Sequence, residues 1–72
     1  MPETQDNLTI QLNGNDYDLA APATVETLVE LRQPSPPFAV EVNKQLVRHT
    51  DYEQTPLQAG DAVEIVTLVG GG

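Results

Sequence analysis

Residues 8–19 read LTIQLNGNDYDL, and apolar and polar side chains alternate on both sides of an Asn-Gly pair. Such alternation is typical of half-buried β-strands, because successive side chains of a strand point to opposite faces. Asn13 and Gly14 both tolerate the positive φ that a tight hairpin turn requires. The stretch therefore predicts a β-hairpin, and the apolar face of this hairpin consists of Leu8, Ile10, Leu12, Tyr17 and Leu19.

A short helix is predicted after the hairpin. The hydroxyl of Thr24 can accept a hydrogen bond from the free N–H groups of a first helical turn. Apolar residues then recur at helical spacing, at Val25, Leu28 and Val29, with Leu31 nearby. Residues 34–37 read PSPP, which cannot continue a helix, so the helix spans roughly eight to ten residues.

The rest of the chain predicts short strands and turns. Strands are expected at 38–42, 46–48 and 62–69, turns at 43–45 and 59–61, and a polar loop with room for one helical turn at 51–56. One helix on one mixed sheet lets both elements bury their apolar faces together. We therefore expect an α+β fold, the ubiquitin-like β-grasp, with four to five strands packed on one short helix. Residues 1–69 would form this domain and residues 70–72 a flexible glycine tail.

The composition limits the kinds of site that this chain can build. It has 72 residues, no cysteine and one histidine, His49, so neither disulfides nor a cysteine- or histidine-based metal site is expected. A formal net charge of −8 disfavours binding to the phosphates of nucleic acids. The same charge either speeds encounter with a basic protein surface or serves solubility alone, and both interpretations stay open.

No export or membrane segment is expected. Residues 1–7 have neither the basic region nor the apolar core of a signal peptide. No apolar run approaches the length that spans a bilayer. The default expectation is a cytoplasmic protein.

The last predicted strand has two different faces. Glu64 should face water, so the opposite face, with Val63 and Ile65, is expected to pack against the helix. Val66 and Leu68 then lie on the outer face, immediately before the tail. They are either two isolated exposed aliphatic residues or a docking patch for a partner.

The residues do not suggest an enzyme. No Ser-His-Asp arrangement is apparent, and His49 is interpreted as a surface residue. The acidic pair Glu26 and Glu30 lies one helical turn apart, which is more typical of a solvated helix face than of catalysis.

Three glycines, Gly70, Gly71 and Gly72, follow the last predicted strand. When extended they reach about 10 Å, and without side chains they can thread a narrow channel into the active site of another protein. The α-carboxylate of Gly72 is a poor electrophile. Adenylation with ATP by a partner would attach a leaving group that a sulfur or nitrogen nucleophile can displace.

Several segments together resemble the thiamine-biosynthesis sulfur carrier (ThiS) family. They are AVEVN at 39–43, LVR at 46–48, LQAGDAVEIV at 57–66 and the terminal glycines, with further fits at 8–14 and 25–31. The resemblance covers most of the chain. The combination of Gly60-Asp61, residues 63–66 and a C-terminal Gly-Gly is specific, whereas the prolines at 34–37 are less typical.

The resemblance implies a β-grasp sulfur carrier that binds no cofactor and has no enzymatic activity of its own. It implies three partners: an E1-like enzyme that adenylates the terminus with ATP, a sulfur-donating enzyme that forms a thiocarboxylate, and a thiazole synthase that receives the sulfur. By position, Gly72 carries the acyl group, Gly71 completes the glycine pair and Gly70 extends the reach. A chain without cysteine cannot hold sulfur as a side-chain persulfide, which fits this role.

Three alternatives stay open. A sulfur carrier of the kind found as the small subunit of molybdopterin synthase has the same fold and the same Gly-Gly end. A protein modifier would use the same activation chemistry and join Gly72 to lysine side chains. In a plain interaction domain the tail would be inert.

Overall fold

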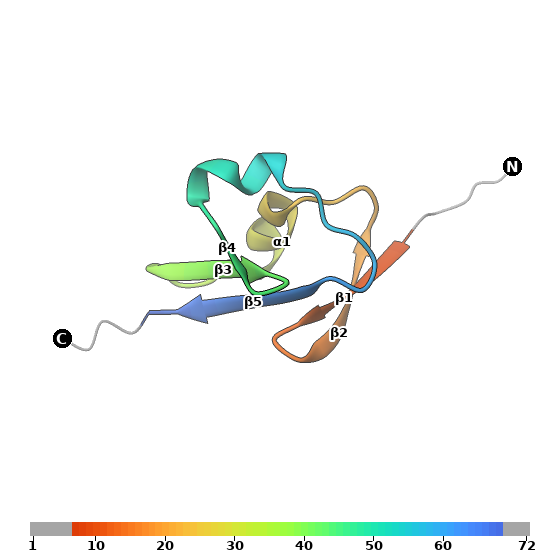
Figure 1. Ribbon diagram of the computed structural model, residues 1–72, viewed down its shortest axis with the longest axis horizontal. Helices are drawn as coiled ribbons and strands as arrows, with labels where there is room; N and C mark the ends of the chain where they lie inside the picture. The colour runs from red at the N-terminus through yellow and green to blue at the C-terminus, as the bar shows by residue number, and fades with distance from the viewer. Residues whose placement is uncertain (1–6, 69–72) are drawn as a thin grey trace, which may run out of the picture.

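The computed structural model describes residues 7–68. Along the chain the elements are β1 (Asn7–Leu12), β2 (Asn15–Ala20), α1 (Val25–Arg32), β3 (Phe38–Val42), β4 (Gln45–Val47), the 3-10 helix η1 (His49–Gln54) and β5 (Ala62–Thr67). Five strands form one sheet, and α1 lies over one of its faces (Figure 1). The predicted α+β fold, a mixed β-grasp sheet with one short helix, is confirmed.

The sheet has the strand order β2-β1-β5-β3-β4. β1 pairs antiparallel with β2 and parallel with β5, while β3 pairs antiparallel with both β4 and β5. The last strand in the chain therefore lies in the middle of the sheet, between the two hairpins. No helix among residues 7–68 is long and apolar enough to cross a membrane.

Both hairpins turn on residues with positive φ. Asn13 and Gly14 have φ values of 50° and 88°, as the Asn-Gly pair predicts. Asn43 and Lys44 have φ values of 52° and 69° in the second hairpin. That turn is one residue shorter than predicted, because Gln45 already pairs with Val42, and β4 accordingly ends at Val47.

Helix α1 has the predicted cap and length. Thr24 and Thr27 form a reciprocal capping box, in which the Thr27 N–H donates to Thr24 Oγ1 at 3.3 Å and the Thr24 N–H donates to Thr27 Oγ1 at 3.1 Å. The chain leaves the helix through Gln33, which adopts the left-handed conformation. Leu31 does not join the apolar stripe and is 60% exposed. At 100° per residue it lies about 110° around the helix from the middle of the stripe.

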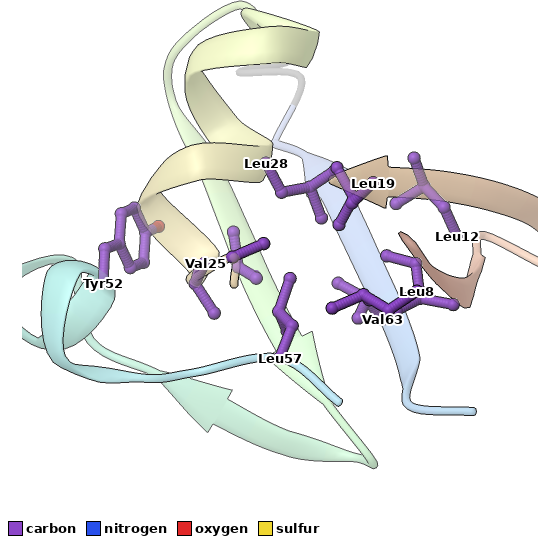
Figure 2. Close-up of a cluster of buried hydrophobic side chains, with 11 residues drawn as sticks. Leu8, Leu12, Leu19, Val25, Leu28, Tyr52, Leu57 and Val63 are labelled. Atoms are coloured by element: carbon purple, nitrogen blue, oxygen red, sulfur yellow. The ribbon is translucent and has the colours of Figure 1, made fainter. Parts of the chain in front are cut away.

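The core lies between α1 and the sheet (Figure 2). It consists of Leu8, Ile10, Leu12, Leu19, Ala23, Val25, Leu28, Val40, Tyr52, Leu57 and Val63. Val63 and most of the hairpin face and helix stripe are buried as predicted, whereas Tyr17 and Val29 are half-buried against the core. Tyr52 and Leu57 were missed, because they lie in and after the segment that reads as a polar loop. That segment overlaps η1, which brings the Tyr52 ring against Phe38, with ring centroids 6.4 Å apart.

Candidate functional site

Strand β5 positions the residues that precede the glycine tail. The strand ends at Thr67, which pairs with Phe38, and the Leu68 N–H donates to the Pro37 carbonyl at 2.8 Å. Gly70, Gly71 and Gly72, the residues expected to carry the chemistry, lie outside the described residues, and so does Val69, the predicted end of the strand. Gly72 is four residues after Leu68 in the sequence. The described part of the site is therefore the base of the tail.

Two asparagine side chains tie the hairpin turns to β5. Asn13 Nδ2 donates to the Ile65 carbonyl at 3.1 Å, and Asn13 Oδ1 accepts from the Ile65 N–H at 2.8 Å. Asn43 Oδ1 accepts from the Ala62 N–H at 2.9 Å, and Asn43 Nδ2 donates to Asp61 Oδ1 at 3.1 Å. Both residues were predicted only as turn residues. Their second role depends on a partner strand far along the chain, so local sequence carries no signal for it.

The outer face of the sheet, opposite α1, carries exposed apolar side chains next to the tail. Val66 is 43% exposed and Leu68 is 49% exposed, so the prediction that both face solvent is confirmed. Val66 lies opposite Ala39 in the register of β3 and β5. Leu46 on β4 is 67% exposed and adds a third apolar side chain, which the sequence did not single out. Binding of a partner to this face stays a prediction.

Two carboxylates lie side by side on the same outer face. Glu41 and Glu64 are register partners in β3 and β5, and Leu46 is opposite Glu41 on β4. Both glutamates point away from the core, because their neighbours Val40 and Val63 are buried. Like charges directly opposite each other in a sheet destabilise it. A cationic side chain placed between them by a partner would remove this repulsion.

Among residues 7–68, no three His, Cys, Asp or Glu side chains are grouped so that they could hold a metal ion. His49 is exposed, as expected, and its ring lies nearly perpendicular to the Tyr52 ring at a centroid distance of 5.2 Å. The main feature of the described site is therefore the outer face of the sheet along β5, with its exposed apolar side chains and its pair of glutamates.

A model of the ThiS family matches residues 10–72, which include the terminal glycines. This chain belongs to the ThiS family. The fold is also similar to that in a crystal structure of the ThiS thiamine biosynthesis protein from Geobacter metallireducens. The TM-score is 0.77 at 25% sequence identity, and the superposition covers 90% of this ThiS-family chain and 100% of the other chain.

Two kinds of curated relative are similar to this ThiS-family chain. It is 34% identical over 67 residues to the uncharacterized protein ycf40 of Porphyra purpurea, which covers 92% of this chain and 94% of ycf40. It is 38% identical over 66 residues to a thiazole synthase of Paramagnetospirillum magneticum. That match covers 90% of this chain but 20% of the synthase, so this chain spans about a fifth of the length of that relative.

Proposed function

We propose that this protein is a sulfur carrier in thiamine biosynthesis and that its carrying group is the terminal carboxylate of Gly72. The observation that carries the proposal is the match of the ThiS family model through residue 72, which includes the glycine tail as well as the folded domain. The fold match to a ThiS protein supports the same role. The carrier acts as a co-substrate of other enzymes rather than as an enzyme.

The chemistry begins with activation of the carboxylate. In the proposed sequence, a carboxylate oxygen of Gly72 attacks the α-phosphorus of ATP in the active site of an E1-like enzyme, and pyrophosphate leaves. A sulfur nucleophile from a sulfur-donating enzyme then attacks the acyl carbon and displaces AMP. When that nucleophile is a cysteine persulfide, the product is an acyl disulfide. A second thiol of a partner enzyme attacks the donor cysteine sulfur, so that a disulfide forms and the thiocarboxylate of Gly72 leaves. Thiazole synthase finally accepts the sulfur. ATP is used by the partner, and the carrier itself holds no cofactor.

The geometry at the base of the tail supports this use of the terminus. β5 pairs with β1 at Ala62 and Val63 and with β3 from Val63 to Thr67. Nearer the tail, the Asn13 amide holds Ile65, and the Leu68 N–H donates to the Pro37 carbonyl. From Leu68, four further residues span at most about 14 Å. A partner that binds the sheet beside Val66 and Leu68 therefore receives the acyl carbon within a defined distance of its binding surface.

The thiazole synthase relative supports the identity of one partner. In that protein, a segment similar to this chain is part of a polypeptide named thiazole synthase. Joining two proteins that act on each other in one chain raises their effective concentration. We therefore include a separate thiazole synthase among the partners of this carrier. The expected cytoplasmic location stays a prediction.

The intact mass of the protein purified from its native host tests the proposal. We expect a fraction of the molecules to carry sulfur in place of one terminal oxygen, and a variant that lacks Gly72 should show no such species. Thiamine auxotrophy of a deletion strain, corrected by the thiazole precursor, is the second expected result. Correction by molybdopterin instead, or recovery of Gly72 in isopeptide linkage to lysine, would replace this proposal with one of its alternatives.

A further inference from the structure

A hollow of about 580 Å³ lies on the helix side of the sheet, between the first hairpin, the end of α1 and the second half of β5. We call it the helix-side hollow. It is lined by Leu12, Asn13, Asn15, Asp16, Tyr17, Arg32, Pro34, Ile65 and Thr67. It is on the opposite face of β5 from Val66, and it reaches Thr67, the last residue of the strand.

The hollow lies at the C-terminal end of α1, where both Arg32 and Pro34 line it. The helix ends at Arg32, and the left-handed Gln33 turns the chain away. Val63 is covered and fully buried, whereas Ile65, two residues nearer the tail on the same face, is only half-buried. The predicted packing of Ile65 on the inner face is thus correct in direction, but its side chain is partly open to the hollow.

A cation is held at the rim of this apolar floor. The guanidinium carbon of Arg32 lies 5.4 Å from the centroid of the Tyr17 ring, which is a cation–π contact. A guanidinium over a ring face can still donate from its N–H groups to a carboxylate. Arg32 is one of three basic residues in a chain of net charge −8. In such an acidic chain, a basic side chain is one of few groups that can attract a carboxylate.

Two of the polar side chains that line the hollow, Asn13 and Asp16, have hydrogen-bond partners within the chain. The Asn13 amide is bonded to the Ile65 backbone, and the Asp16 carboxylate accepts from the Gln11 amide. Arg32 is therefore the group at the hollow with the most hydrogen-bonding capacity for a ligand. The floor of Leu12, Tyr17 and Ile65 offers apolar contact within reach of it.

We infer that the helix-side hollow binds a segment of a partner protein in which an aliphatic side chain stands next to an Asp or Glu. The aliphatic group covers Ile65 and Leu12, and the carboxylate pairs with Arg32. This binding site is distinct from the proposed carrier chemistry, because it requires only that a partner contacts the base of the tail and not that the terminus is activated. With this site, the two faces of β5 attract groups of opposite charge. Glu41 and Glu64 on the outer face favour cations, whereas Arg32 favours a carboxylate, so a partner is oriented around the strand.

A small probe tests the site without any partner enzyme. N-acetyl-leucyl-aspartate, with its α-carboxyl amidated, is titrated into the ¹⁵N-labelled full chain, and amide chemical shifts are followed. We expect saturable shifts centred on Tyr17, Arg32 and Ile65. The matched asparagine dipeptide should bind about tenfold more weakly, because it lacks the charge that strengthens the hydrogen bond to arginine.

Variants separate the site from general electrostatics. Arg32→Gln should lose the same roughly tenfold preference for the aspartate probe, whereas Arg48→Gln, an equal change of charge at another exposed arginine, should keep it. Shifts that are scattered over the surface, or equal for both dipeptides, would overturn the inference. If Arg32→Gln fails to fold, the two dipeptides on the unaltered protein still decide it. Because no carrier chemistry is involved, a negative result here leaves the proposed function standing, and the converse also holds.

Discussion

The side chain of Asn13 pairs with the backbone of Ile65 as a neighbouring strand would, through both the N–H and the carbonyl of that residue. The parallel ladder between β1 and β5 matches Leu12 with Val63, and the Asn13 N–H donates to the Val63 carbonyl at 2.9 Å. The Asn13 amide thus extends the pairing by one more residue of the same edge of β5, towards the tail. A turn residue of the first hairpin thereby holds the strand from which the glycines extend.

Replacing Asn13 with alanine should destabilise the fold. The variant loses two hydrogen bonds, each worth about 1 kcal/mol, and places alanine at a φ that costs it about 1 kcal/mol. We expect the free energy of unfolding, measured in urea, to fall by about 2–3 kcal/mol. Asn13→Gly keeps the conformational freedom and should lose less. Asn15→Ala, two residues away and exposed, is the matched control. An Asn13→Ala variant as stable as this control would mean that the amide pairing contributes nothing.

Ile10 and Ile65 should respond differently to the same truncation. Ile10 is fully buried, whereas Ile65 is open to the helix-side hollow. We expect Ile10→Ala to lower the free energy of unfolding by about 3–5 kcal/mol and Ile65→Ala by about 1–2 kcal/mol, since the exposed site leaves no closed cavity. Denaturant titration of both variants measures the difference. Equal losses would show that Ile65 is as enclosed as the core.

The stability of the protein should depend on Tyr52 in alkaline solution. Burial raises the pKa of the Tyr52 hydroxyl above its ordinary value of 10.0. Above pH 10.0 the unfolded chain therefore loses this proton while the folded chain retains it, so the free energy of unfolding falls as the pH rises. Tyr52→Phe should lose less stability between neutral and strongly alkaline pH. Parallel urea titrations test this, and identical pH profiles for the two proteins would rule out a contribution from Tyr52.

Leu68→Ala should weaken binding to the adenylating enzyme or to thiazole synthase. An exposed apolar side chain beside the tail is suited to anchor a partner, and its truncation should cost more than ~1 kcal/mol, mostly through faster dissociation. Surface plasmon resonance gives both rate constants. Leu31→Ala, an equal truncation of an exposed leucine on α1, is the control. If the Leu31 and Leu68 variants bind alike, the outer face is not the docking surface.

Added salt should lower the association rate constant for binding to these partners. The acidic surface steers a basic partner, and screening at higher ionic strength shortens the range of that attraction. We expect association to slow with added salt while the dissociation rate changes little. The same measurements at several salt concentrations test this. An association rate that is independent of salt would leave solubility as the sole role of the net charge of −8.

The tail should tolerate no addition. If the acyl group forms on Gly72, one extra C-terminal residue places the carboxylate beyond the adenylation site and should abolish ATP–pyrophosphate exchange by the adenylating enzyme. Gly71→Ala should have the same effect, because a side chain obstructs threading. Thermal unfolding should be nearly unchanged in both. One extra residue at the N-terminus is the matched control, and normal exchange with the extended tail would contradict the proposed chemistry.

Local sequence determined most of the secondary structure. Alternation around Asn13-Gly14 specified the first hairpin, and Thr24 with the residues at 34–37 specified both ends of α1. These signals could be read because each depends on residues close together in the chain, whose side chains and backbone act on one another before any tertiary contact forms. The outward direction of Val66 followed from the same rule of alternation.

Only the tertiary structure decided how these elements complete one another. The amide of Asn13 reaches Ile65, a residue 52 positions later, and Glu41 stands opposite Glu64 because of the register of β3 and β5. The hollow beside Ile65 depends on where the end of α1 lies relative to β5, and the sequence of neither element alone specifies that position. Tyr52 is buried because η1 folds over Phe38. Register, coverage and burial are set by distant segments packing together, and periodicity within one segment cannot report them.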